Sequence, residues 1–168
     1  DGYFEYDWVA PSSQLEVKPR EYEAQKLEIF KVEVWLNKVE VSQRLIGVQF
    51  WLHYNASLLN IVNATEGLFL SQFRNSATEP YTAFFNVTED QTVKIGILIL
   101  PNATGEWNVF PQGNGTLAMI TFRGIYQGQY PEKATSALEL TNITAIDDSM
   151  KDIKLLPPIN GLYRILPR

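Results

Sequence analysis

Residues 45–59, LIGVQFWLHYNASLL, alternate in the way expected of a β-strand with one buried face. Successive side chains of a strand point to opposite faces, so every second residue falls on the same side. A helix would need apolar residues three and four apart, and that spacing would mix the two sets. The alternation stops at Asn55 and resumes at Leu58, which predicts a central strand, a turn and a second strand. The face expected to be buried consists of Ile46, Val48, Phe50, Leu52 and Tyr54.

Similar runs along the rest of the chain predict an all-β fold. Gly, Pro and Asn separate these runs, and no helical period appears. Short strands at this spacing are typical of a jelly-roll or immunoglobulin-like β-sandwich, here of about nine strands. The other predicted strands are residues 14–18, 27–36, 81–88, 93–100, 116–125, 137–146 and 161–166, and residues 37–44 and 101–115 are predicted as a turn and a loop.

Two of these strands carry particular expectations. Residues 93–100, VKIGILIL, are almost continuously apolar, which predicts a strand buried on both faces. Residues 81–88 place Tyr81, Ala83, Phe85 and Val87 on one face. Outside the central strand, the core is expected to contain Phe30, Val32, Val34, Leu36, Ile95, Ile97, Ala118, Ile120 and Phe122.

The composition is that of one globular domain. The chain has 168 residues, of which 45% are hydrophobic, and this is enough for a sizeable core. The net charge of −5 argues against a nucleic-acid-binding surface, since such surfaces are basic. No run of eighteen apolar residues is present, so no membrane-spanning helix is expected. The chain lacks cysteine, which excludes disulfides and thiolate metal sites.

Signals for N-glycosylation are more frequent than chance predicts. The triplet Asn-x-Ser/Thr occurs six times, whereas about one is expected when roughly a ninth of the residues are Ser or Thr. The preference of Asn and Thr for turns explains one or two of these triplets but not six. The sequence therefore predicts an extracellular or cell-surface glycoprotein. The predicted acceptors are Asn55, Asn63, Asn86, Asn102, Asn114 and Asn142.

The first thirteen residues form a segment apart from the predicted domain of residues 14–168. Phe4, Tyr6, Trp8 and Ala10 share one face of a period-two run, and residues 11–13, PSS, follow as a linker. Such an aromatic face is too apolar to remain in water. The segment either adds to an edge of its own sandwich or inserts into a neighbouring subunit as a donor strand. The second arrangement does not close on itself and would build a filament or tube.

Catalysis has little support in the sequence. His53 is the single histidine and is expected to be a packing or surface residue of the central strand. No nucleophile–base pair and no phosphate-binding loop can be assigned, so the chain is predicted not to be an enzyme and to require no cofactor.

Two kinds of binding site remain open. Asp147, Asp148 and Asp152 cluster after a predicted strand and could hold calcium, although a solvated Asp-rich turn explains them as well. Trp35, Trp51 and Trp107 are candidates for a carbohydrate platform or for structural packing.

Several motifs in order resemble the cohesin domain family. The first half contains FKVEVWLNKVE, LIGVQFWLHYNASLLNIV and EGLFL; GNGTLAMITFRG, which ends at Gly124, is similar to the family's Gly-x-Leu-Ala-x-Ile-Thr-Phe strand. ALELTNITAIDDSMKDI and INGLYRIL resemble its last two strands. The likeness covers about residues 14–166. It implies a nine-stranded jelly-roll related to carbohydrate-binding modules, which binds a dockerin and does not catalyse.

Two functions follow as expectations. The first is a secreted structural protein that polymerises with copies of itself through its N-terminal donor strand, since the chain resembles in layout the glycosylated β-sandwich subunits of some archaeal extracellular filaments. The alternative is a cohesin-type module that captures a dockerin-like protein or a carbohydrate at the cell surface.

Overall fold

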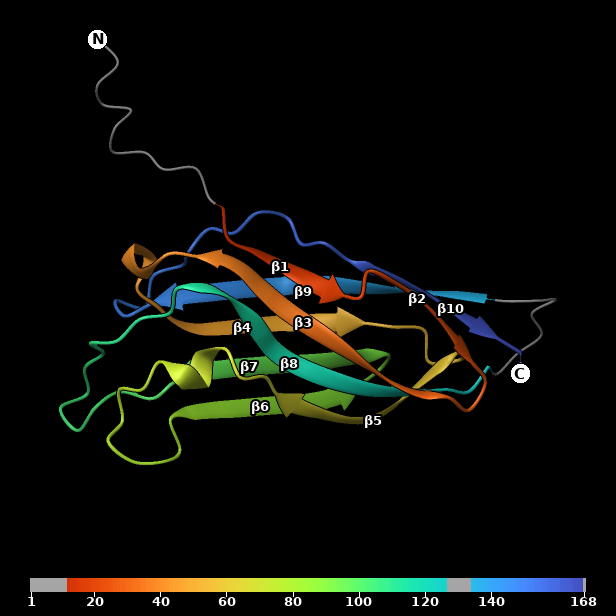
Figure 1. Ribbon diagram of the computed structural model, residues 1–168, viewed down its shortest axis with the longest axis horizontal. Helices are drawn as coiled ribbons and strands as arrows, with labels where there is room; N and C mark the ends of the chain where they lie inside the picture. Colours follow the sequence, from red (N-terminus) through yellow and green to blue (C-terminus); the bar gives the residue numbers. More distant parts are fainter. Residues whose placement is uncertain (1–11, 127–133, 168) are drawn as a thin grey trace, which may run out of the picture.

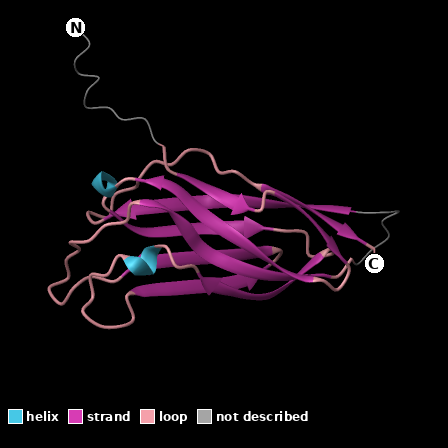
Figure 2. Cartoon of the chain, in the orientation of Figure 1, coloured by secondary structure: helices cyan, strands magenta, loops and turns pink. Residues whose placement is uncertain are grey.

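The protein is a sandwich of two β-sheets. The computed structural model describes residues 12–126 and 134–167 (Figure 1). Within them strands make up nearly all of the regular structure, and helix is limited to two short turns (Figure 2). The strands are β1 (Gln14–Lys18), β2 (Glu21–Gln25), β3 (Ile29–Val39), β4 (Leu45–His53), β5 (Leu59–Glu66), β6 (Thr82–Glu89), β7 (Thr92–Ile99), β8 (Gly113–Gly124), β9 (Ala134–Asp147) and β10 (Gly161–Leu166). The two 3-10 turns are η2 (Val41–Gln43) and η3 (Leu70–Gln72).

The order of the strands places β4 near the centre of the larger sheet. Four strands follow the order β1-β3-β8-β5, and six follow the order β2-β10-β9-β4-β7-β6. Neighbouring strands are antiparallel, apart from β2 and β10, which pair in parallel. The predicted all-β sandwich and its central strand are therefore confirmed.

The core lies between the two sheets and is built from alternate residues of the central strands. β4 contributes Val48, Phe50 and Leu52, and the other residues predicted for the core are buried too, with the exception of Tyr54. Tyr54 is only half-buried, and its ring packs edge-on against Phe122 with the ring centroids 5.3 Å apart. Period-two alternation thus predicted which face of each strand points inward.

Two strands differ from the sequence prediction in extent. β3 continues to Val39 through a segment predicted as a turn, because its pairing with β8 shifts register twice and so accommodates the polar residues. β2 was not predicted at all. Its sequence, EYEAQ, is short and charged, and it is held by parallel pairing with β10, about 140 residues later in the chain.

The prediction that VKIGILIL is buried on both faces is wrong. On β7, Val93, Ile95, Ile97 and Ile99 enter the core, whereas Lys94, Gly96 and Leu98 face outward and are half-buried. No described segment forms a layer over that outer face. The described residues contain no helix of the length and apolarity needed to span a bilayer.

Candidate functional site

The outer face of β9, β4, β7 and β6 carries a cross-strand array of side chains. Strand register sets its rows, since residues opposite one another on the same face are neighbours. One row runs from Phe85 through Gly96 and Gln49 to Thr144. The row on one side of it contains Ala83, Leu98, Gly47 and Ile146, and the row on the other side contains Val87, Lys94, Trp51 and Thr141.

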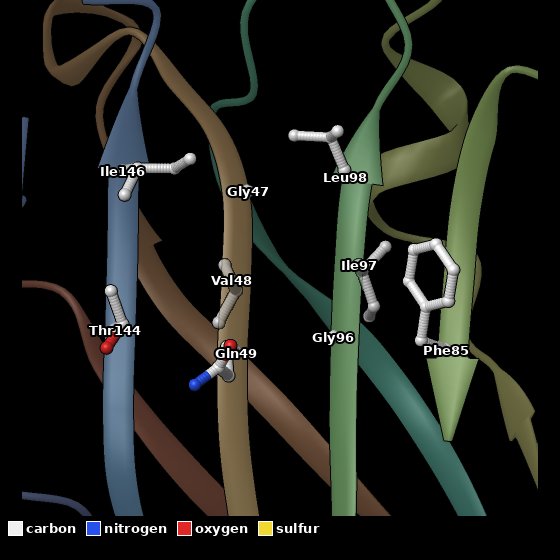
Figure 3. Close-up of a pocket in the computed structure, with 9 residues that line it drawn as sticks. All are labelled: Gly47, Val48, Gln49, Phe85, Gly96, Ile97, Leu98, Thr144 and Ile146. Atoms are coloured by element: carbon white, nitrogen blue, oxygen red, sulfur yellow. The ribbon is translucent and has the colours of Figure 1, made fainter. Parts of the chain in front are cut away.

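Gly96 leaves a gap in the middle row. A Cβ atom added at Gly96 would meet no atom within 4 Å, whereas one added at Gly47 would lie 3.2 Å from Leu98 Cδ1 and 3.3 Å from Ile146 Cγ1. The result is an open groove over β7, flanked by Phe85 on β6 and Gln49 on β4 (Figure 3). The Phe85 side chain is 65% exposed. One wall of the groove is therefore an aromatic ring that the described residues do not cover.

The groove continues toward a polar end at Trp51, Lys94 and Glu89. The Lys94 ammonium lies 4.3 Å from the centroid of the Trp51 ring and 2.6 Å from Glu89 Oε1. The hydrogen bond from Lys94, together with its positive charge, lowers the pKa of Glu89. The groove therefore has an apolar half and a charged half, which lie next to each other on the same sheet.

His53 lies at the end of β4 next to Trp51 on this face. It is a packing residue, as the sequence predicted. Its Nε2 lies 2.6 Å from Thr141 Oγ1 and its Nδ1 lies 2.8 Å from Thr92 Oγ1. Both ring nitrogens thus have a hydroxyl partner, and within the described part of the chain no carboxylate hydrogen-bonds the ring in the way that orients a catalytic base.

The three aspartates proposed for calcium are not brought together as a cation site. Asp148 binds the guanidinium of Arg44 through two nitrogens, and this hydrogen bonding lowers the pKa of Asp148. Asp147 Oδ1 accepts the backbone N–H groups of Ser149 and Lys151 and so closes a turn. Among the described residues, no group of three His, Cys, Asp or Glu side chains is placed to hold a metal ion.

The tryptophans divide between packing and the outer face. Trp107 packs against the core and donates its indole N–H to Ile99 O at 2.8 Å, so its role is structural packing. Trp35 lies on the outer face of the smaller sheet under the Lys18 ammonium, 3.8 Å from the ring centroid. Of the three, only Trp51 belongs to the groove.

The predicted glycan acceptors fall into two groups. Asn63, Asn86, Asn114 and Asn142 are exposed. Asn55 and Asn102 are half-buried, and each side-chain oxygen accepts hydrogen bonds from the N–H and the hydroxyl of the Ser or Thr two residues later. The predicted donor-strand residues Phe4, Tyr6, Trp8 and Ala10 lie outside the described residues.

The groove itself was not predicted from the sequence. Its signal was a glycine in the run VKIGILIL, which marks a place where a strand lacks a side chain on one face. A second signal was the pair Phe85 and Val87. By alternation they lie on the same face of their strand as Ala83, and Phe84 lies on the opposite face. Strand order was needed to show that these residues are neighbours.

Cohesin domains are among the solved structures with the same fold. A non-cellulosomal cohesin from the hyperthermophilic archaeon Archaeoglobus fulgidus is 20% identical, with a TM-score of 0.67 over 94% of this chain and 92% of that chain. The match to a type I cohesin–dockerin complex from Clostridium thermocellum has 14% identity and a TM-score of 0.71, over 96% and 97% of the two chains. The cohesin CaCohA2 of Clostridium acetobutylicum is 17% identical, with a TM-score of 0.65 over 91% of each chain. No family profile and no curated protein matches the sequence. The chain thus has a cohesin-like β-sandwich fold, as the sequence motifs predicted.

Proposed function

We propose that this chain is a cohesin-type binding module that holds a dockerin-like protein against the outer face of β9, β4, β7 and β6. The observation that carries the proposal is the open groove over Gly96, with Phe85 exposed beside it. Some of the solved structures that share the fold are cohesin–dockerin complexes, which is why a dockerin-like partner is preferred to a carbohydrate.

The apolar character of this face supports a protein partner. Phe85 and Val87 expose 65% and 55% of their surface, and Phe85 lines the groove together with Leu98 and Ile146. Contiguous exposed apolar surface on a soluble domain usually marks an interaction site. The outer face of the other sheet carries charged groups near its β1 end: Glu16 and Glu33 accept side-chain hydrogen bonds there, and the Lys18 ammonium lies over the Trp35 ring.

The geometry suggests how the partner is held. One apolar side chain of the partner fills the gap over Gly96 and packs against the Phe85 ring, and a polar group meets Lys94 or Glu89 at the other end. The groove lies on paired strands, so little conformational entropy is lost on binding. Apolar contacts of this kind supply most of the affinity, while the charged end sets orientation.

The proposed module works outside the cell. Six glycosylation triplets and the similarity to cohesins support a cell-surface or secreted location.

Filling the groove tests this function. In Gly96→Val, the new side chain has space and suits a strand, so the domain folds normally but the groove is blocked. Wild-type and variant protein are used as bait for proteins secreted by the source organism, and captured proteins are identified by mass spectrometry. The proposal requires that wild type captures a protein with a dockerin sequence and that Gly96→Val does not. Thr121→Val, on the outer face of the other sheet, is the matched control and should capture normally.

Self-assembly is the second candidate function. The donor would be residues 3–10 of another copy. Deleting residues 1–10 should then abolish filaments seen by electron microscopy of native material, and filaments that persist after the deletion would exclude it.

A further inference from the structure

Two of the sheet edges in the described structure are long and open. The smaller sheet ends in β1 and β5, and the larger sheet ends in β2 and β6. β5 and β6 have eight residues each, against five for β1 and β2. Figure 1 draws β5 and β6 along the same margin of the sandwich. Each edge strand presents backbone N–H and C=O groups that can pair with another chain.

The edges at β1 and β2 are protected by familiar means. Residues 156–159 run beside β1: Val17 N–H donates to Ile159 O at 2.9 Å, and Ile159 N–H donates to Leu15 O at 2.9 Å. β2 carries Glu21 and Glu23 on its five residues. Short length, charge and a covering segment are the usual protections against edge-to-edge pairing.

The edges at β5 and β6 are less well protected. Their sequences, LNIVNATE and TAFFNVTE, contain no Lys, Arg or Pro, and the single charged residue of each strand is the glutamate at its end, Glu66 or Glu89. β6 pairs with β7 through all eight residues without a bulge, and Val62 on β5 is half exposed. β5 has one register shift, between Ile61 and Asn63. Long, apolar edges of this kind are predicted sites of aggregation.

Instead, each open edge carries a glycosylation triplet in the same place. The two strands end in NATE and NVTE, so Asn63 and Asn86 are both the fifth of eight residues. Both asparagines are exposed, and neither side chain makes a hydrogen bond within the described structure. They therefore differ from Asn55 and Asn102, whose side-chain oxygens close turns.

We propose that Asn63 and Asn86 carry N-linked oligosaccharides whose role is to keep the β5 and β6 edges from pairing with other chains. The co-substrate is a lipid-linked oligosaccharide phosphate, used by a separate transferase. A bond forms between Asn Nδ2 and the anomeric carbon, the bond from that carbon to the phosphate oxygen breaks, one proton leaves Nδ2, and the lipid phosphate departs. The attached sugar is bulky and strongly hydrated, so it excludes a strand from the adjoining edge.

This role leaves the proposed partner-binding face free. Asn86 alternates with Phe85 along β6, so its side chain points away from the outer face that holds the groove. A glycan at Asn86 and a donor strand at β6 compete for the same edge. The inference is independent of the partner that the groove binds.

Two measurements test the inference. Glycopeptide mass spectrometry of native protein should find Asn63 and Asn86 occupied. Protein made in a host without N-glycosylation should self-associate in sedimentation velocity at a concentration where native protein is monomeric. The double variant Asn63→Lys/Asn86→Lys, also unglycosylated, should return to monomer because lysine protects an edge.

The matched control is Gln112→Lys/Ala137→Lys, which changes the net charge equally at exposed positions away from β5 and β6. It should self-associate like the unglycosylated wild type. The inference is overturned if the native asparagines are bare, if unglycosylated wild type stays monomeric, or if the control rescues as well as the edge variant. Glycopeptides from native protein test the inference even where a variant fails to fold.

Discussion

Removing the Phe85 ring should weaken partner binding and leave stability nearly unchanged. The ring is 65% exposed, so Phe85→Ala removes few contacts within the domain. Surface substitutions of this kind usually change the free energy of unfolding by no more than about 0.5 kcal/mol. For a domain of this size, that corresponds to a shift of about 1 to 2 °C in thermal midpoint.

The expected loss of affinity follows from the area left to bury. A phenylalanine buries about 200 Å² when fully enclosed, and 65% of that leaves about 130 Å² for the partner. At about 25 cal/mol per Å², this is worth about 3 kcal/mol. Side-chain ordering at the interface lowers the value, so we expect about 2 to 3 kcal/mol, or roughly a 30- to 150-fold rise in Kd.

Isothermal titration against the captured dockerin domain measures this change. Leu68→Ala is the matched control, because Leu68 is 76% exposed but lies in the segment after β5, away from the groove. Its Kd should stay within about twofold of wild type, which is less than about 0.5 kcal/mol. If Phe85→Ala binds as tightly as Leu68→Ala, Phe85 is not part of the interface and the reasoning from exposed area fails.

Three further predictions concern the fold. Phe50→Ala should lower the free energy of unfolding in urea by about 3 to 5 kcal/mol, since Phe50 is fully buried; an unchanged midpoint would contradict the register of β4. Gly67→Ala should destabilise the domain by about 1 to 3 kcal/mol, because its Cβ would lie 2.2 Å from Thr116 O, whereas Gly96→Ala should be close to neutral; equal effects would refute the packing described for these glycines. Burial raises the pKa of the Tyr163 phenol above its unfolded value of 10.0, so stability is unaffected below that pH and falls above it. In unfolding titrations, the free energy of unfolding of Tyr163→Phe should fall less above pH 10 than that of wild type. An equal fall in both proteins would show that Tyr163 ionises freely in the folded state.

The sequence predicted the features that depend on local pattern. Alternation in LIGVQFWLH and GTLAMITF assigned the inward faces of β4 and β8, because an amphipathic strand has only one way to bury its apolar side. The motifs also pointed to the cohesin-like fold. Long-range pairing was not accessible in this way, which is why the parallel pairing of β2 with β10 was missed.

The candidate site depended on information that the sequence pattern does not carry. A strand such as VKIGILIL can have an apolar outer face because another layer of the same domain covers it, or because a partner protein does. The sequence run is the same in both cases. Only the position of β7 beside the edge strand β6 showed that the outer face is open. The same strand order placed Asn63 and Asn86 on edges, where the sequence had shown only two triplets among six.

Methyl-group NMR spectra of the domain, recorded with and without the captured dockerin domain, test the central claim most directly. If the partner binds over the groove, the methyl signals of Val87, Leu98 and Ile146 should shift, because these residues lie beside Phe85 and Gly96. Those of Val62 and Leu68, which are exposed elsewhere, should not move. Binding that shifts Val62 or Leu68 and leaves Val87, Leu98 and Ile146 unchanged would contradict the proposed face.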